Sequence, residues 1–448
     1  MVTQSKVAKK IPHIPEYPLV GSLPAFMKER LHLFERMAQK SSICSFRIGP
    51  VRMVMLNKPE YIQYVLVDYA SDFDKGQIMH KAMNGNNGLF SSEGDFHHQQ
   101  RKLLSPPFQP RHISSYADTI GHYGEQIQQT WHDDECIDLN QQMINLTMSI
   151  IGKILFDADV FSETDELGAA MAIGFEHTVQ VLTSLFSPPL SWPTPHNQRT
   201  RRAIQQVEDR IQRMIDERRN STLERNDFLS ILLQARGDNG EVMSDRQVMD
   251  ECITLFGAGH ETTAAALAWA WYFLCQNPAI YQKVQEEVDA VLQGRTPTFA
   301  DLPHLPYCLQ VFKETMRLYP PAAAIIRETL HAIEIDGYQL PQGTTIFLSP
   351  YTLHRIPEYF PMPEQFDPER FTPEREKQLP RYAYLPFGAG PRVCIGNHLA
   401  LMEGQLLIAT LAQRVTFDLV PGQTVEPDPA HNLALRPGGR VDVIVKRR

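Results

Sequence analysis

Cysteine is scarce in this 448-residue chain, which has six cysteines with no Cys-x-x-Cys pair and no cluster among them. This scatter excludes a zinc ribbon and a disulfide framework, and it favours a reducing compartment such as the cytoplasm. An excess of basic charge is also missing, because the formal net charge is -9. Without a basic footprint, we expect no nucleic-acid partner.

Neither a secretory leader, a linker nor an internal repeat is recognisable. The stretch MVTQSKVAKKIPHIPEYPLVGSLP is polar and rich in proline, without the apolar run of a signal peptide. Residues 253–275 form an apolar stretch long enough to cross a bilayer, but Glu261 lies near its middle, where an acidic residue costs about 2.5 to 3.5 kcal/mol. We therefore predict a buried core helix, no stable membrane anchor, and a single domain over residues 1–448.

Helical periodicity is what the sequence has in abundance. Apolar residues recur at steps of three and four over 143–154, 204–215 and 280–291, which predicts amphipathic helices. Strand-like alternation is confined to ICSFRIGPVRMVMLN, AIEIDGYQLPQGTTIFLSP and RVDVIVKRR. The predicted fold class is mainly α with a small β portion. The prolines and glycines between about 340 and 394 predict a long, ordered, irregular segment, and such segments usually serve function.

That segment ends in FGAGPRVCIG, residues 387–396, which places Cys394 among three glycines and Arg392. A lone cysteine is most often an inert buried side chain. Here, however, glycines that let amide groups point at the sulfur, a nearby cation and a following helix all stabilise a thiolate. A nucleophile needs a base, and His398 is poorly placed for that role. Haem takes one axial ligand from the protein, so a lone thiolate suits haem best.

The same stretch matches the pattern FxxGxRxCxG, which is the haem-binding signature of the cytochrome P450 family. The resemblance implies that Cys394 is the proximal ligand to the iron of haem b (iron protoporphyrin IX). It also implies that Arg392 pairs with a haem propionate, that Phe387 shields the sulfur, and that Gly388 belongs to the haem-binding loop.

A second resemblance to this family lies in KETMRLYPP and FDPERF. Glu314 and Arg317 are three residues apart and so share one helix face. By itself, such a pair fits an exposed ion pair equally well. The family resemblance implies instead that Glu314, Arg317 and Arg370 form a buried structural network, whose disruption costs folding and haem retention.

AGHETT, at 258–263, resembles the oxygen-binding segment of the family. We predict that Gly259 leaves room for a ligand and that Thr262 bonds a backbone carbonyl or water and opens the helix locally. The resemblance makes Glu261 and Thr262 the catalytic pair, with Glu261 offering a proton route. An HExxH zinc site is excluded, because Ala264 stands at its second histidine position.

Further residues resemble family positions around the haem propionates and the substrate. In GDFHHQQRKLL, the resemblance places His97 and Arg101 against a propionate. It places Arg327 of AAIIRETL there too, although a solvated strand arginine fits Arg327 equally well. The residues expected to line the substrate pocket are apolar: Phe90, Ala258, Ala323, Ile325 and Leu433.

The family resemblance implies a largely helical triangular prism and a monooxygenase. One atom of O2 enters a lipophilic substrate, such as a terpenoid or fatty-acid-like molecule, and the other leaves as water. No GxGxxG motif is present, so we expect electrons from a separate ferredoxin or flavodoxin with its reductase, docking near Lys102 or Arg392. Two alternatives stay open: a haem sensor without turnover, and a peroxide-dependent or non-oxygenating haem-thiolate protein.

Overall fold

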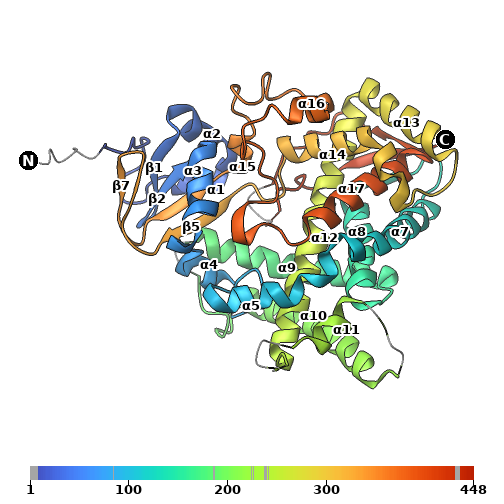
Figure 1. Cartoon of the computed structure of the whole chain (residues 1–448), viewed down its shortest axis with the longest axis horizontal. Helices are drawn as coiled ribbons and strands as arrows, with labels where there is room; N and C mark the ends of the chain where they lie inside the picture. Colours follow the sequence, from blue (N-terminus) through green and yellow to red (C-terminus); the bar gives the residue numbers. More distant parts are fainter. Residues whose placement is uncertain are drawn as a thin grey trace, which may run out of the picture.

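The computed structural model describes residues 9–83, 85–184, 187–222, 225, 227–236, 240, 242–428 and 434–448. Helices dominate these residues, and strands form a smaller part, as the sequence predicted. The largest sheet and the β6–β7 hairpin lie at one end of the molecule, and α7, α8, α13 and α17 lie at the other end (Figure 1).

The longer helices carry most of the core. They are α2 (Arg30–Lys40), α5 (Gly94–Leu104), α7 (Ala117–Gln129), α8 (Leu139–Phe156), α9 (Thr164–Thr183), α10 (Pro195–Asn220), α12 (Asp245–Gln276), α13 (Pro278–Leu292), α14 (Pro306–Leu318) and α17 (Asn397–Ala412). The short helices are α1 (Leu23–Lys28), α3 (Pro59–Gln63), α4 (Gly76–Ala82), α6 (Pro110–Ile113), α11 (Phe228–Gln234), α15 (Pro350–Leu353) and α16 (Pro373–Glu376). The three periodic stretches thus fall in α8, α10 and α13, which confirms those predictions.

Ten strands form three small sheets among the described residues. They are β1 (Ile43–Ile48), β2 (Val51–Leu56), β3 (Phe73–Asp74), β4 (Cys136–Asp138), β5 (Ile325–Thr329), β6 (Ile333–Ile335), β7 (Tyr338–Leu340), β8 (Thr345–Leu348), β9 (Val415–Leu419) and β10 (Asp442–Arg447). The sheets have the orders β1-β2-β8-β5-β3, β4-β10-β9 and β6-β7. β2 and β8 pair in parallel, with Met53 opposite Thr345, and the other pairs are antiparallel.

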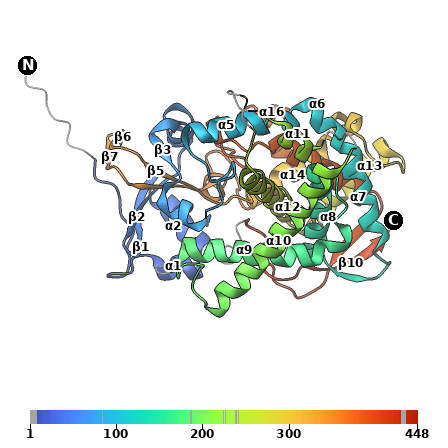
Figure 2. The ribbon, with the colours of Figure 1, turned by 90° about the horizontal axis from the view of Figure 1, so that it is seen from below.

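Helix α12 runs through the middle of the helical part, with α9 and α10 crossing one side of it (Figure 2). It begins at Ser244, whose side chain accepts a hydrogen bond from the Gln247 amide and so caps the helix. Trp269 and Trp271 are fully buried in the core that α12 forms with α8, α14 and α17. An apolar helix buried over most of its length belongs to a protein core. The described part of the chain contains no helix long and apolar enough to cross a membrane.

The proline- and glycine-rich segment before α17 is largely irregular, as predicted, with β8 and the short helices α15 and α16 as its strand and α-helical pieces. Two 3-10 turns, Pro368–Phe371 and Gly390–Arg392, also lie in this segment. It packs on the π-helical turn Tyr64–Asp68 through Gly390. Gly390 has φ 70°, and a Cβ there would lie 1.7 Å from the carbonyl oxygen of Leu66. Only glycine fits this close approach, so the glycine fixes where the cysteine loop lies.

Candidate active site

The loop that carries Cys394 is held by its own backbone. The Cys394 amide donates to the carbonyl of Phe387 at 2.9 Å, and Gly388 has φ 69°, in the left-handed region that favours glycine. The Gly396 amide lies close enough to the Cys394 sulfur to act on the thiol. Burial raises the pKa of the Cys394 thiol, whereas the Gly396 amide and the nearby Arg101 lower it.

The surroundings of Cys394 fit a bound group. Its side chain is exposed, yet removal from water by surrounding protein is the largest influence on its pKa. Both hold only if the sulfur faces an internal space. Helix α12 also has exposed side chains although it lies in the core. Ala258 and Thr262 are exposed, whereas Glu261 and Thr263 are buried. Residues four apart lie on the same helix face, so other side chains leave one face of this core helix uncovered at Ala258 and Thr262.

A cluster of cationic side chains surrounds the cysteine loop. We call it the cation cluster, and its members are Lys75, Arg101, Arg327 and Arg392, with His97 beside them. Burial and then repulsion from Arg392 lower the pKa of Lys75 to about 7 and that of Arg327 to about 10. Among the described residues, the carboxylates that act on these cations are Glu93 and Asp74.

The cation cluster therefore has more positive than negative charge. Four cations face two carboxylates, Glu93 and Asp74. The group that raises the pKa of the fourth cation, Arg101, is Cys394. Buried charges in proteins are normally paired. The two propionates of a haem, next to a cysteine that faces an internal space, supply the missing negative charge. The residues present therefore fit the cofactor that the sequence implied.

Arg392 is held on the chain segment that precedes α5. Its Nη1 donates to the carbonyl of Ser92 at 2.9 Å, and its Nη2 pairs with the Glu93 carboxylate. The Lys75 amide donates to Glu93 Oε1 at 3.2 Å, and the Lys75 ammonium lies 4.1 Å from the ring centroid of Phe90. Sequence reasoning missed Lys75 and Glu93, because a single lysine after a short strand belongs to no motif.

The structure distinguishes His97 from its neighbours on α5. His97 is buried and close enough to Arg392 and Lys75 for both to lower its pKa, whereas His98 is exposed. Burial is the largest cause, and the pKa of His97 falls to about 3, so its imidazole is neutral. Arg101 lies one helical turn further on, beside Cys394. This geometry agrees with the register that the family resemblance gave.

Arg327, on β5, is not the solvated strand arginine that the sequence left open. Its Nη1 donates to the carbonyl of Ile326 at 2.8 Å, and burial is the largest cause of its lowered pKa. The next cause is Arg392, so the two guanidinium groups lie close together. β5 therefore directs Arg327 into the cation cluster.

Helix α12 holds Glu261 away from bulk water. The side chain is buried, the Ala434 amide donates to its carboxylate, and Arg436 is nearby. Burial raises the pKa of Glu261 to about 7, although Arg436 and the Ala434 amide lower it. A carboxyl group with this pKa exchanges its proton readily at neutral pH.

Thr262 makes the predicted bond to a backbone carbonyl, because its Oγ1 donates to Ala258 at 2.8 Å. The predicted local opening of the helix is not found, since α12 is continuous α-helix through this residue. The prediction for Gly259 was wrong. A Cβ at Gly259 would lie 2.7 Å from Cγ1 of Ile151 on α8, so this glycine allows two helices to pack closely. Sequence reasoning assigned it to the ligand space, because a single sequence does not reveal which side of a helix faces its neighbour.

The Glu314–Arg317–Arg370 network is buried, as the family resemblance implied. Arg317 Nε and Nη2 donate to the two carboxylate oxygens of Glu314 at 2.7 and 2.9 Å. Arg370 Nε donates to Glu314 Oε1 at 3.3 Å. The remaining donors reach backbone carbonyls, with Arg317 bonding His354 and Gln365. Glu314 and Arg317 are 0% exposed, so each charge depends on these partners.

His354 connects this network to the cysteine loop, and sequence reasoning missed it. Its Nε2 accepts from the Leu385 amide at 2.7 Å, so its Nδ1 carries the proton and donates to the Arg317 carbonyl at 3.2 Å. Burial and then Arg317 lower the pKa of His354 to about 3, which keeps the imidazole neutral. Leu385 lies two residues before Phe387. The network therefore supports the start of the loop.

The predicted pocket residues lie in several parts of the chain. Phe90 is 49% exposed, and Ala258 is exposed on α12. Ile325 lies beside the cysteine loop, because a Cβ at Gly388 would be 3.8 Å from its Cδ1. Ala323 is half-buried near the start of the same strand. Leu433 lies outside the described residues.

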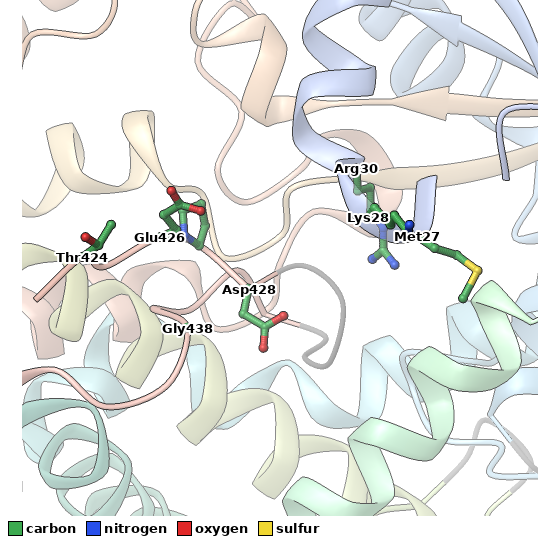
Figure 3. A pocket seen from close by; sticks show the side chains of 8 residues that line it. Met27, Lys28, Arg30, Thr424, Glu426, Asp428 and Gly438 are labelled. Atoms are coloured by element: carbon green, nitrogen blue, oxygen red, sulfur yellow. The ribbon is translucent and has the colours of Figure 1, made fainter. Parts of the chain in front are cut away.

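A surface pocket lies elsewhere, between the α1–α2 junction and the chain that leads to β10 (Figure 3). Met27, Lys28 and Arg30 line one side, and Glu426 and Asp428 line the other. Asp428 acts on Arg30, which is largely removed from water, and partly offsets the lowering of its pKa by burial. No residue predicted for the active site lines this pocket, so the chemistry is not assigned to it.

Comparison with known proteins identifies relatives over almost the whole chain. The family model described as Cytochrome P450 matches residues 12–444. Cyclooctatin synthase and cyclooctat-9-en-7-ol 5-monooxygenase of Streptomyces melanosporofaciens are each 35% identical to this chain. The alignments cover 94% and 91% of this chain, and 92% and 89% of those proteins. Pentalenene oxygenase of Streptomyces avermitilis is 31% identical over 92% of each chain.

A solved structure gives the same answer for the fold. Retinoic acid bound cyanobacterial CYP120A1 matches with a TM-score of 0.88 and 25% identity, over 99% of this chain and 100% of that chain. Proteins of this family hold haem through a cysteine thiolate, and their reaction takes a lipophilic substrate, O2 and electrons from a redox partner. The predictions of fold class and enzyme class are therefore confirmed. The chain belongs to the cytochrome P450 family and is a haem-thiolate monooxygenase.

Proposed function

We propose that this enzyme hydroxylates a cyclic terpenoid, with haem b as its cofactor and Cys394 as the residue that would hold the haem iron. The observation that carries the cofactor assignment is the Cys394 sulfur, which faces an internal space and lies beside the Gly396 amide and the Arg101 guanidinium, both of which lower the pKa of its thiol. The names of three relatives support the substrate class, because they refer to cyclooctatin, cyclooctat-9-en-7-ol and pentalenene.

The cation cluster holds the haem propionates in this proposal. Arg392, Arg327 and Arg101 supply guanidinium donors, and the neutral imidazole of His97 supplies a further hydrogen-bonding group. Phe387 covers the sulfur side, and Gly388 keeps the loop close to the cofactor. When bound, the haem iron supplies the binding and reductive activation of O2.

Glu261 and Thr262 deliver protons to the site. The Glu261 carboxyl is buried between α12 and Ala434, and its pKa of about 7 lets it both hold and release a proton at neutral pH. Thr262 presents its hydroxyl to the internal space while donating to Ala258. Its oxygen lone pairs are thus available to orient a water that carries the proton onward.

The pocket residues favour a hydrocarbon-rich substrate. Phe90, Ala258, Ala323, Ile325 and Leu433 carry no charge and no polar side chain. A pocket of this kind binds its ligand by excluding water from apolar surface, which suits the ring skeleton of a terpenoid. Orientation then depends on shape, since the assigned residues offer few hydrogen bonds.

Electrons come from a separate ferredoxin or flavodoxin with its reductase in this proposal. The partner docks on the cysteine side, where α5 carries Lys102 beside Arg101. A basic surface attracts such acidic carriers. We further propose that the enzyme works in the cytoplasm as a single haem domain; its scattered cysteines support the location, and the family match over 12–444 supports the single domain.

A substrate screen with product analysis tests this function. Cyclic di- and sesquiterpene hydrocarbons and alcohols are titrated into the haem-loaded enzyme, and binding is read as a shift of the haem absorption to high spin. Compounds that bind are then incubated with surrogate ferredoxin, reductase and isotopically labelled O2. A hydroxylated terpenoid that contains one labelled oxygen is expected. Products from fatty acids alone, turnover with peroxide alone, or binding without any product would overturn the proposal.

A further inference from the structure

The segment formed by residues 86–93 is attached to helix α12 at one end. The Asn87 amide donates to Asp250 Oδ2 at 3.1 Å, and the Leu89 amide donates to Glu251 Oε2 at 2.8 Å. The Asn86 side chain donates to the Asp250 carbonyl at 3.2 Å. Carboxylate acceptors on the helix thus satisfy two backbone donors of the segment.

Gly88 allows this attachment to be close. A Cβ there would lie 2.3 Å from Thr254 Oγ1 and 2.8 Å from the Asp250 carbonyl oxygen. Both contacts are far below ordinary van der Waals distance, so any side chain would push the segment off the helix. Glycine is therefore the residue that fits at position 88, between Asn87 and Leu89, whose amides bond to α12.

The other end of the 86–93 segment is attached to the cysteine loop, through the bonds from Arg392 to Ser92 and Glu93. Phe90 lies between the two attachments. Its neighbours Leu89 and Ser91 are buried, whereas Phe90 is 49% exposed. The two attachments therefore determine where this aromatic ring stands.

Glu251 is a carboxylic acid at a fully buried position on α12. It is 0% exposed, and its Oε1 is buried without a hydrogen-bond partner among the described residues. Burial raises the pKa of Glu251 to about 7, although the Leu89 amide lowers it. A buried carboxyl group is costly. Its bond to the Leu89 amide is the contact that offsets this cost.

We propose that Glu251 is a positioning residue, which fixes Phe90 through the Leu89 amide and so sets how bulky a ligand the site accepts. Glu251 acts through the backbone and does not touch the substrate. The inference rests on the proposed function in one respect, namely that Phe90 lines the substrate pocket.

Two azole ligands of haem test this role without any turnover. Imidazole is small, whereas 4-phenylimidazole carries a phenyl ring that must fit beside the pocket residues. The ratio of their dissociation constants, measured by optical titration of the haem-loaded enzyme, reports the space near Phe90. For Glu251→Ala we expect this ratio to change by about fivefold, the size of one aromatic contact. Glu251→Gln keeps an acceptor for the Leu89 amide, so its ratio should stay at the wild-type value.

A glycine pair provides the second arm and its control. Gly88→Ala disturbs the same attachment while leaving Glu251 in place, and it should change the ratio in the same direction. Gly174→Ala on α9 is the matched control, because a Cβ there meets nothing within 4 Å. Should Glu251→Ala fail to retain haem, Gly88→Ala decides the question with the same readout.

A double variant separates positioning from general support of the fold. In a Phe90→Ala background, Glu251→Ala should have no further effect on the ratio, because its effect passes through Phe90. A wild-type ratio in haem-loaded Glu251→Ala, or an undiminished effect without Phe90, would overturn the proposal. Because neither azole is oxidised, failure of the proposed terpenoid function would appear only in the product analysis and is distinguishable from these outcomes.

Discussion

The molecule contains two groups of charged side chains, one fully buried and one largely half-buried, that are built in opposite ways. In the Glu314–Arg317–Arg370 network, a carboxylate and several backbone carbonyls accept from the two guanidinium groups. In the cation cluster, burial and then Arg392 lower the pKa values of Lys75 and Arg327, burial and Arg101 lower that of Arg392, and Glu93 and Asp74 offset only part of the charge.

The difference separates a structural group from a binding group. A satisfied network needs nothing further, and its strength appears when one partner is removed. An unsatisfied cluster raises the free energy of the ligand-free protein, and it recovers that energy when an anion binds. The two groups should therefore respond in opposite directions to loss of a cation.

Removal of Arg317 should have the largest effect. Arg317→Met leaves the Glu314 carboxylate buried without its main partner, which should cost about 3 to 5 kcal/mol of unfolding free energy. Urea denaturation of the haem-free and haem-loaded proteins measures the loss. Arg36→Ala is the control, because the exposed Arg36–Glu29 pair should contribute less than about 1 kcal/mol. Equal effects of the two variants would contradict the structural role.

Removal of the thiolate should abolish activity while the Glu314–Arg317–Arg370 network stays intact. Cys394→Ser replaces the sulfur, and the bond from the Cys394 amide to the Phe387 carbonyl does not depend on the side chain. The carbon monoxide complex of the reduced protein should then lose the red-shifted Soret band typical of thiolate ligation, and oxygenation should fall below detection. Circular dichroism checks that the fold is kept. A retained thiolate-type band would exclude Cys394 as the ligand.

Removal of one cation from the cluster should give the opposite pattern to Arg317→Met. Arg327→Leu relieves repulsion from Arg392, so the haem-free protein should be as stable as the wild type or more stable. Haem should dissociate about tenfold faster or more, since a charge-assisted contact to a propionate is lost. Transfer of haem to apomyoglobin measures that rate. A destabilised haem-free protein with unchanged haem release would mean that Arg327 is structural.

Lys75 should make the stability of the haem-free protein depend on pH. Burial, then Arg392 and Arg327, lower its pKa from 10.5 to about 7. An unfolded chain keeps the lysine proton up to the ordinary pKa, so it binds more protons than the folded chain between pH 7 and 10.5. Stability should therefore rise with pH in this window, relative to Lys75→Met. Urea denaturation at about pH 7 and about pH 9 compares the two proteins, and parallel pH profiles would refute the prediction.

The smallest effect on stability and haem binding should come from Thr262→Ala. The variant loses one bond from a side chain to the carbonyl of Ala258, worth about 1 kcal/mol or less. The absorption spectrum should stay unchanged, whereas the product formed per electron should fall and hydrogen peroxide should rise. Oxygen uptake, peroxide and product are measured together. Unchanged coupling would remove Thr262 from proton delivery.

Much of the site could be read from the chain, because its motifs are local. The signature around Cys394 and the ExxR pair each lie within one loop or one helical turn, where spacing alone places side chains together. The burial of α12 also followed from composition. The position of His97 was harder to predict from the sequence, because Phe96 and His98 flank it. Only the packing of α5 shows which of these rings points into the protein.

Other residues of the site carried no signal in the sequence. Lys75, Glu93 and His354 belong to no motif, and each gains its role from a partner far along the chain. Gly259 was assigned to the wrong partner, because the residue it faces, Ile151, belongs to another helix. A single sequence does not show such pairings.

The sequence by itself determined the enzyme class and the mainly helical fold, and it supplied Cys394 as the proposed cofactor ligand, because each of these depends on residues that are neighbours along the chain. Tertiary structure alone decided that the charges around Arg392 are left unbalanced, whereas Glu314 is paired with its arginines. It also decided that Glu251 holds the segment that carries Phe90. The reason is physical: burial and charge balance depend on all groups within a few ångströms, and folding brings these groups together from distant parts of the chain.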